Sequence, residues 1–359
     1  MIVVGTFVYL RPAAPAHPSY AGPARIPELD SRFWPAFDFI TPSLGWAAIS
    51  EAGVSWAFVY RTTDGGAHWQ KQFVQKVPYS GSPSIHFFDS KHGFLYTDRL
   101  FSSSDGGEHW SVISIPDATA NFAFASPTSG WALDGQVVYG TKDGGLTWRT
   151  VGRAPALGYL GKGFGEFAFR AGGEGWIGGV GSTPFLYATL DGGANWRQIG
   201  LPVTATALPL PVPQGKPYVQ GYTTAIRLLP GEGVLAQSFD WVGHVNLYVS
   251  VDHGDSWSQI VRPPDPATIA DVSFVDATHW WASRFGFLYK SSDGGRTWQP
   301  QKMIVPEVVG DWNLGPLSTI DGRHAWLIMR TGAMRSSSAL LMTSDGGRNW
   351  TLVNVPQPV

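Results

Sequence analysis

Seven copies of one eight-residue motif, Ser/Thr-x-Asp-x-Gly-x-x-Trp, constrain the fold of this 359-residue chain more than any other feature. We call each copy a box, and all seven keep the four defining residues. Their aspartates are Asp64, Asp105, Asp143, Asp191, Asp252, Asp293 and Asp345. Successive aspartates lie 41, 38, 48, 61, 41 and 52 residues apart. This spacing is typical of one four-stranded propeller blade with loops of varying size.

A second repeat lies upstream of each box and has the same count. An alternating apolar run such as Phe37-Asp38-Phe39 is followed by a polar turn and a second run such as Gly45-Trp46-Ala47. Closely similar pairs begin at Phe122 and Phe167, and weaker copies begin at Phe87, Ile226, Val272 and Leu317. Alternation with a period of two is typical of strands, and no window shows a sustained helical period.

These repeats predict an all-β fold, a seven-bladed β-propeller with four-stranded antiparallel blades and a box in every blade. We expect residues 25–359 to form this single domain and residues 1–24 to form a flexible leader. The expected blades are 35–78, 84–116, 121–153, 166–202, 224–263, 270–304 and 316–356.

The box has a mechanical explanation that requires no active site. Its aspartate suits a tight hairpin between the third and fourth strands, where the carboxylate accepts backbone N–H bonds. The glycine two residues later suits a positive φ, and the tryptophan is expected to pack inward. Because every blade repeats the motif, whereas an active site is needed once, we interpret all seven box aspartates as structural.

The boxes resemble the Asp-box, or BNR, repeat of sialidases, xyloglucanases, sortilin-type receptors and photosystem II stability/assembly factors. The upstream Phe-x-Phe and Gly-Trp-Ala runs, seven times over residues 37 to 355, make the chain most similar to the assembly-factor family and its relatives. The resemblance implies the propeller fold. It leaves function open, because this scaffold carries unrelated activities.

Composition restricts the partners and the chemistry. The formal net charge is −2, which argues against nucleic acid or an anionic membrane as the main partner. The chain has no cysteine, which excludes disulfides, thiolate metal sites and cysteine nucleophiles. The nine histidines show no ligand spacing, and the Gly-Gly pairs precede no helix. We therefore predict no metal and no cofactor.

The N-terminus allows two interpretations. Residues 1–10 are almost wholly apolar but too short to span a bilayer, and residues 11–24 form a Pro/Ala tract. The segment is either a disordered leader or the remnant of an export signal or anchor. The family resemblance favours export, so we expect an extracytoplasmic protein, secreted or attached to the envelope, with no transmembrane span of its own.

Function is expected on the face where loop length varies. In a four-stranded meander, the turn between the second and third strands and the connection to the next blade lie on one face, and variable loops there commonly carry binding sites. The candidate partner-binding residues on this face are Trp56, Trp241, Trp312, Asp240, Asp311, Arg99, Arg284, Arg330 and Arg335. Tryptophan beside a carboxylate suits a sugar or a protein hot spot equally well, and packing of the long loops is the alternative.

The four arginines of that set would form a basic patch on one rim, unless they are separately solvated. Assembly-factor propellers are thought to hold a protein client with an arginine patch, and the resemblance extends that expectation to this chain. The residues outside the boxes do not align with that patch one by one.

Glycoside hydrolysis is the alternative function. Arg25-Ile26-Pro27 resembles the Arg-Ile-Pro motif of sialidases, and Arg227 and Arg284 would complete a carboxylate-binding triad. A xyloglucanase-like reaction would instead need two carboxylates across a cleft, drawn from Asp98, Asp134, Asp240 and Asp311. Ala24 stands where sialidases have an aromatic residue, and xyloglucanases use two propellers.

We therefore predict a non-catalytic scaffold that binds a protein, a membrane-protein complex or a glycan on the variable-loop face. A glycoside hydrolase acting in the central funnel remains the alternative.

Overall fold

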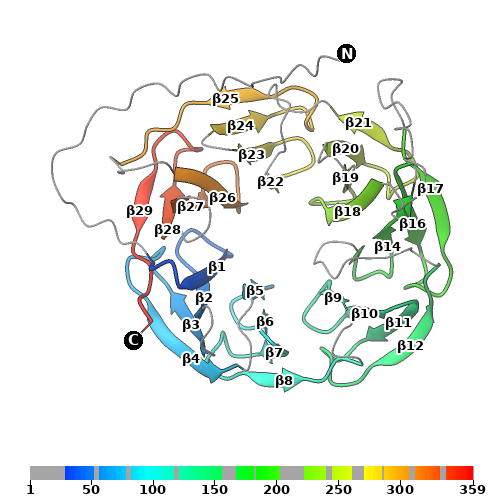
Figure 1. The fold of residues 1–359 in the computed structure, drawn as a ribbon, viewed down its shortest axis with the longest axis horizontal. Coiled ribbons are helices and arrows are strands. Elements are labelled where there is room, and N and C mark those ends of the chain that lie inside the picture. The colour runs from blue at the N-terminus through cyan, green and yellow to red at the C-terminus, as the bar shows by residue number, and fades with distance from the viewer. Residues whose placement is uncertain are drawn as a thin grey trace, which may run out of the picture.

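The chain folds into a ring of seven antiparallel sheets (Figure 1), which confirms the predicted all-β, seven-bladed propeller. The structure is a computed structural model and describes residues 29–51, 56–77, 82–116, 121–155, 167–181, 183–202, 222–239, 245–260, 271–284, 287–306, 312–331 and 337–358. Throughout these ranges the regular structure is β, without a helix. The predicted leader, residues 1–24, lies outside them.

Each blade is a meander whose first strand lies at the centre of the ring and whose fourth lies at the rim (Figure 1). Blade 1 holds β1 (Phe33–Phe39), β2 (Gly45–Glu51), β3 (Trp56–Thr62) and β4 (Gln70–Lys76). Blade 2 holds β5 (Ser84–Phe87), β6 (Gly93–Tyr96), β7 (Leu100–Ser103) and β8 (Ser111–Ile113). Blade 3 holds β9 (Asn121–Phe124), β10 (Gly130–Asp134), β11 (Val137–Thr141) and β12 (Arg149–Arg153).

The remaining four blades follow the same plan. Blade 4 holds β13 (Phe167–Phe169), β14 (Gly175–Gly178), β16 (Phe185–Thr189) and β17 (Arg197–Gly200). Blade 5 holds β18 (Tyr222–Leu228), β19 (Val234–Phe239), β20 (Val245–Ser250) and β21 (Ser258–Ile260). Blade 6 holds β22 (Asp271–Phe274), β23 (Trp280–Arg284), β24 (Phe287–Ser291) and β25 (Gln299–Gln301). Blade 7 holds β26 (Trp312–Thr319), β27 (Ala325–Thr331), β28 (Ser338–Thr343) and β29 (Thr351–Val353).

One short strand joins two blades. β15 (Val180–Gly181) follows the second strand of blade 4 but pairs with β18, the inner strand of blade 5. The sheet of blade 5 therefore has five strands, and the seam between blades 4 and 5 contains a backbone ladder.

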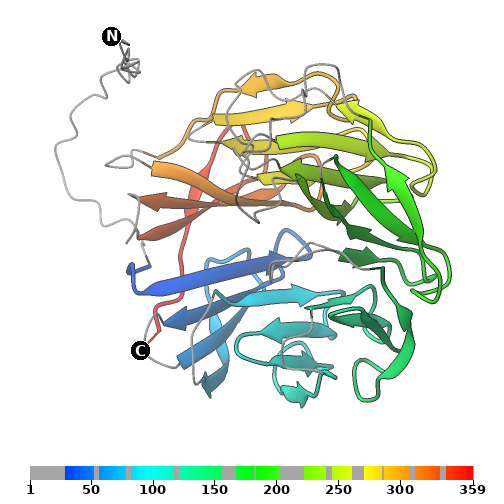
Figure 2. The same ribbon diagram turned by 45° about the vertical axis from the view of Figure 1, so that its right-hand side comes forward.

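Hydrogen bonds place the box turn beside the first turn of the same blade. The N–H of Gly65 donates to the carbonyl of Ser43 at 2.8 Å, and Gly106 donates to Lys91 in the same way. These two turns define one face, which we call the box face. The turns between second and third strands and the connections between blades lie on the opposite, variable-loop face, and the strands run between the two faces (Figure 2).

The box is a closed set of hydrogen bonds, which blade 3 illustrates. The Thr141 hydroxyl donates to Asp143 Oδ1 at 2.8 Å and accepts the N–H of Gly145 at 2.9 Å. Asp143 Oδ1 also accepts the N–H of Thr147, whose hydroxyl donates to Oδ2 at 2.6 Å. Gly145 has a φ of 90°, as expected for the second box glycine. Both carboxylate oxygens are therefore held within their own turn.

These bonds favour the ionised carboxylate. The Thr147 hydroxyl, its backbone N–H and the Thr141 hydroxyl lower the pKa of Asp143 to about 2. In blade 1 the backbone N–H of His68, its ring and the Thr62 hydroxyl lower the pKa of Asp64 to about 2. The pKa of each of the other five box aspartates is also about 2.

Aromatic stacking joins consecutive blades. Trp46 of blade 1 stacks on Phe87 of blade 2, with ring centroids 3.6 Å apart and planes 4° from parallel. Trp131 of blade 3 stacks in the same way on Phe169 of blade 4, at 4.4 Å. The Nε1 of Trp46 also donates to the carbonyl of Gly106 in the box of blade 2. The tryptophan of one blade thus contacts both repeated motifs of the next.

The glycine that opens the second strand of a blade makes room for this stack. A Cβ on Gly45 would lie 2.3 Å from the ring of Phe39, and one on Gly93 would lie 2.6 Å from Phe87. The Phe ring therefore lies flat over the glycine of its own blade and exposes its other face to the tryptophan of the preceding blade.

The ring closes between blade 7 and blade 1 by the same stack. Trp326 of blade 7 packs on Phe39 of blade 1 at 4.1 Å. Both chain ends cross this seam as well. Buried Leu29 forms a one-residue antiparallel bridge to Ser338 of blade 7, and the carbonyl of Asn354 accepts the Nε1 of Trp69 in blade 1. The ring therefore closes by face contact between blades 7 and 1, and Leu29 adds a short edge pairing.

Truncating an inter-blade tryptophan should destabilise the whole ring. Trp46 is fully buried, so we expect Trp46→Ala to lower the free energy of unfolding by about 3–5 kcal/mol in urea titrations. Trp46→Phe keeps a stacking ring but removes the hydrogen bond to Gly106, so this variant should lower the free energy of unfolding by only about 1–2 kcal/mol. A loss below about 1 kcal/mol for the alanine variant would show that the stack does not support the ring.

The boxes should make folding sensitive to acid. A carboxyl whose folded pKa lies below its unfolded value of 3.8 stabilises the fold above that value and loses this contribution as the pH falls through about 2. At about pH 3 each box aspartate should take up about 0.8 proton on unfolding. Calorimetric unfolding in buffers of different ionisation enthalpy measures the number of protons taken up, and for Asp143→Asn this number should be about 0.8 lower than for the wild type. Equal proton uptake by variant and wild type would contradict the lowered pKa.

Candidate binding face and the pocket at the ring seam

The described candidate residues all lie on the variable-loop face. Trp56 and Trp312 open β3 and β26, Arg99 lies in the turn between β6 and β7, and Arg284 and Arg330 lie at or near the ends of β23 and β27. The structure describes only the backbone of Arg284 and Trp312. Four further candidates, Trp241, Asp240, Asp311 and Arg335, lie outside the described residues.

Arg99 and Arg330 flank blade 1 from two sides. Arg99 is half exposed, and its Nε lies 3.2 Å from Asp98 Oδ2 in the same turn. Arg330 is exposed and sits on β27 opposite Asn313 and Ser338. Arg99 belongs to blade 2 and Arg330 to blade 7, so blade 1 lies between these two cations.

Between them, blade 1 carries an aromatic pocket of about 350 Å³, which we call the seam pocket. It lies on the side of blade 1 that faces blade 7. Its lining residues are Arg32, Phe33, Glu51, Trp56, Phe58, Val74 and Pro358.

Strand register explains why these residues converge. Trp56 and Phe58 lie two residues apart on β3 and so point to the same side of the sheet. Phe58 pairs with Val74, and Phe33 pairs with Glu51. Pro358 comes from the C-terminal tail, which crosses from blade 7. The pocket therefore depends on ring closure as well as on blade 1.

Its floor is buried and its rim is open. Phe33 and Phe58 are 6% and 8% exposed, whereas Trp56 and Val74 are 38% and 42% exposed. Trp34 on β1 of the same blade is exposed to the same extent, at 39%, but only Trp56 of the two lines the pocket. An open aromatic rim over an apolar floor suits the side chain of a partner.

Two opposite charges stand at the rim. Arg32 Nη1 lies 3.8 Å from Glu51 Oε1, its Nε lies 3.8 Å from Asp30 Oδ2, and its guanidinium lies 4.9 Å from the centre of the Phe33 ring. The Arg32 side chain is 61% exposed and its ion pairs are long, so they contribute little to stability. The guanidinium can therefore exchange these contacts for a partner's polar groups at small cost.

A second depression, of about 560 Å³, opens at the box-face end of the central channel between the inner strands of blades 5, 6 and 7. Its walls include Arg227, Leu229, Val272 and Leu317. Arg227 donates from Nη1 to the carbonyl of Val272 at 3.1 Å and so links two inner strands.

The residues proposed for glycoside hydrolysis are only partly described. Asp98 accepts the Thr97 hydroxyl and pairs with Arg99, so it is engaged in its own turn. Asp134 is half-buried at the end of β10. Arg25, Asp240 and Asp311 lie outside the described residues, and the side chain of Arg284 is not described.

Two general features of the face bear on its chemistry. In the part of the chain that the structure describes, no group of three His, Asp or Glu side chains is placed to share a metal ion. The same part contains no helix of the length and hydropathy needed to cross a bilayer.

The box has one further regular feature, which its four defining residues do not include. The side chain of the residue before each box tryptophan contacts Oδ2 of the box aspartate. In five boxes a hydroxyl or amide donates the hydrogen bond, and in two boxes a histidine Nδ1 makes the contact. These residues are His68, His109, Thr147, Asn195, Ser256, Thr297 and Asn349. All seven side chains can donate a hydrogen bond, which is a signal present in the sequence. The contacts of His68 and His109 therefore belong to the box turn.

No family model and no curated protein matches the chain. Solved structures do. YCF48 bound to D1 peptide is similar with a TM-score of 0.57 and 17% identity, over 89% of this chain and 95% of that one. YCF48 from Cyanidioschyzon merolae is similar with a TM-score of 0.56 and 18% identity, over 88% of this chain and 96% of that one. The GH74 enzyme of Niastella koreensis is similar at 0.60 and 13%, over 91% of this chain and 55% of that one. At these identities the likeness establishes the fold.

Proposed function

We propose that this protein is a non-catalytic scaffold that holds a segment of a protein partner on the variable-loop face, with the seam pocket as its anchor. The observation that carries the proposal is the half-exposed indole of Trp56 above the buried Phe33 and Phe58 rings, beside the loose Arg32–Glu51 pair. Arg99 and Arg330 extend the contact surface on either side.

The chemistry of the pocket favours a protein segment. Interface hot spots are enriched in Trp and Arg, and they pair an aromatic anchor with polar contacts around it. A volume of about 350 Å³ holds one or two apolar side chains. The guanidinium of Arg32 can donate to the carbonyl groups of an extended backbone, and the carboxylate of Glu51 can accept its N–H groups. A structurally similar protein, YCF48, has been seen with a D1 peptide, which is consistent with this use of the fold.

The wider role in this proposal is assembly of a larger complex outside the cytoplasm. It rests on the resemblance of the repeats to assembly-factor propellers and on the apolar and Pro/Ala-rich residues 1–24. A membrane-protein complex is one such partner. A glycan ligand or a hydrolysed glycoside would be alternative outcomes of the test below.

The proposal is tested by affinity capture from fractions of the source cells. Wild-type protein should retain a stoichiometric partner, and Trp56→Ala should lower its recovery at least tenfold, since loss of an anchor costs about 2 kcal/mol or more. The double charge reversal Arg99→Glu/Arg330→Glu should also weaken capture and make it less sensitive to salt. Arg296→Glu, an exposed arginine in the box turn of blade 6, is the matched control and should bind normally.

A stability measurement separates binding from folding. Because Trp56 is 38% exposed, Trp56→Ala should change the free energy of unfolding by about 1 kcal/mol or less. Equal capture by the wild type and Trp56→Ala would overturn the seam pocket as the anchor. Turnover of a glycoside by the wild type would overturn the non-catalytic role.

A further inference from the structure

The fifth box departs from the other six at one position. His253 stands where the others have the first of two glycines. It has a φ of 58° and is the one residue other than glycine with a positive φ among the described residues. The left-handed conformation disfavours side chains with a Cβ, so this histidine is held in place by its surroundings.

In the six other boxes this position makes a backbone contact. The glycine N–H donates at 2.8–2.9 Å to a carbonyl in the turn between the first and second strands of the same blade. The donors are Gly65, Gly106, Gly144, Gly192, Gly294 and Gly346. In blade 5 a side-chain contact joins the box turn to the turn between the first and second strands, because His253 Nε2 lies 3.2 Å from Glu232 Oε1. A backbone hydrogen bond, which does not titrate, is thus replaced by an imidazole–carboxylate contact, which does.

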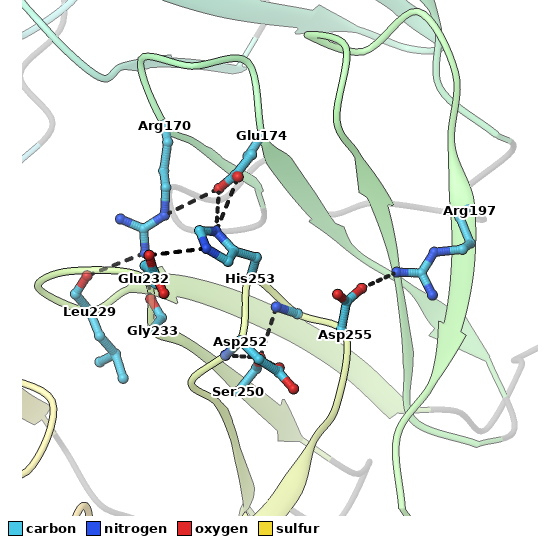
Figure 3. A network of polar contacts seen from close by, with 11 residues as sticks. Arg170, Glu174, Arg197, Leu229, Glu232, Gly233, Ser250, Asp252, His253 and Asp255 are labelled. Carbon is cyan, nitrogen blue, oxygen red and sulfur yellow. Dashed lines mark hydrogen bonds and ion pairs between the residues drawn. The ribbon is translucent and has the colours of Figure 1, made fainter.

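The other ring nitrogen reaches across the seam to blade 4. His253 Nδ1 lies 3.1 Å from Glu174, in the turn between β13 and β14 (Figure 3). Arg170 from the same turn lies 3.8 Å from Glu174 and donates from Nη2 to the carbonyl of Gly233 at 2.6 Å. The imidazole therefore stands between two carboxylates of neighbouring blades, and Arg170 ties the same two turns together.

The remaining charged groups around the ring are already engaged. Asp252 accepts the hydroxyls of Ser250 and Ser256 within the box. Asp255 pairs with Arg197 of β17 at 3.2 Å, on the far side of the box turn (Figure 3). Glu174 and Glu232 are therefore the two acidic partners of the imidazole.

We propose that His253 is a proton-controlled clamp on the box-face end of the seam between blades 4 and 5. A protonated imidazolium donates from both nitrogens and bridges Glu174 to Glu232, whereas a neutral imidazole has one N–H and releases one of them. At the other end of the seam, the β15–β18 ladder is made of backbone bonds and does not depend on the proton. Deprotonation therefore loosens one end of the seam. This inference is independent of the proposed binding function.

The direction of the pH dependence follows from the carboxylates. The hydrogen bond to Glu174, opposed in part by burial, and the charges of both glutamates raise the pKa of His253 above 6.5. A raised folded pKa means that the clamp stabilises the fold fully below about 6.5 and is lost as the pH rises through the folded value. The histidines of other boxes, such as His109, contact the aspartate of their own turn, so these contacts do not join two blades.

Hydrogen exchange of the intact protein tests the clamp. After correction for intrinsic rates, peptides covering residues 167–178 and 226–236 should open about two- to fivefold faster at about pH 8.5 than at about pH 6, the effect expected of an exposed ion-pair network. Peptides from blade 3, whose residues 121–153 include no histidine, should open equally at both values. In a carbon-13 NMR titration, the ring of His253 should titrate above 6.5, and Glu174→Gln should lower its midpoint.

Two variants make the test specific. His253→Gly restores the motif of the other boxes and relieves the left-handed side chain, so it should fold and its seam should lose the pH dependence. His109→Asn replaces a box histidine with the residue type that Asn195 supplies at the same position in blade 4, where it donates to its own box aspartate. The seam between blades 4 and 5 of this variant should remain pH-dependent. Equal protection of the wild-type seam at both pH values, or pH dependence that persists in His253→Gly, would overturn the clamp.

Discussion

Packing of each blade against the next is the contact on which the ring depends, and among the described residues it includes a tryptophan stacked on a phenylalanine at three of the seven seams. A blade is a small sheet with two apolar faces, and it gains stability only when both faces are covered. Stacked aromatic pairs cover them with large rings in a defined orientation, worth about 0.5–1.5 kcal/mol each beyond their burial. The pair Phe39–Trp326 uses the same geometry to close the ring that Trp46–Phe87 uses within it.

This contact also explains why the architecture could be predicted from the sequence. The aromatic residues and the glycine beneath them recur in register with the boxes, so blade number and strand order follow from local patterns. The closing seam does not repeat. The bridge from Leu29 to Ser338 and the approach of Pro358 to Phe58 join residues about 300 positions apart, and no local pattern marks them. Trp56 could be selected as an unrepeated tryptophan on the variable-loop face, but its pocket depends on these distant neighbours.

The two faces of the propeller are used differently. On the box face, hydrogen bonds within each turn occupy both oxygens of Asp143 and its six counterparts, so repetition there reflects folding. The exception at His253 shows that one substitution in a repeated turn can introduce a titrating contact between blades. On the variable-loop face, strand ends carry unrepeated side chains, and the seam pocket combines an open aromatic rim with two loosely paired charges. We propose binding on this face because Trp56, half exposed there, is not required to complete a blade.

Site-specific photo-crosslinking tests the central claim most directly. A photoreactive benzophenone residue at position 74, in place of the 42% exposed Val74, would lie at the rim of the seam pocket and leave Trp56 in place. The same residue at position 296 would lie on the box face. After irradiation in cells, the account predicts a covalent adduct with a partner protein from position 74, with the linkage mapped to one segment of that partner, and none from position 296. An adduct from position 296 alone, or none from position 74 while the ring remains folded, would contradict it.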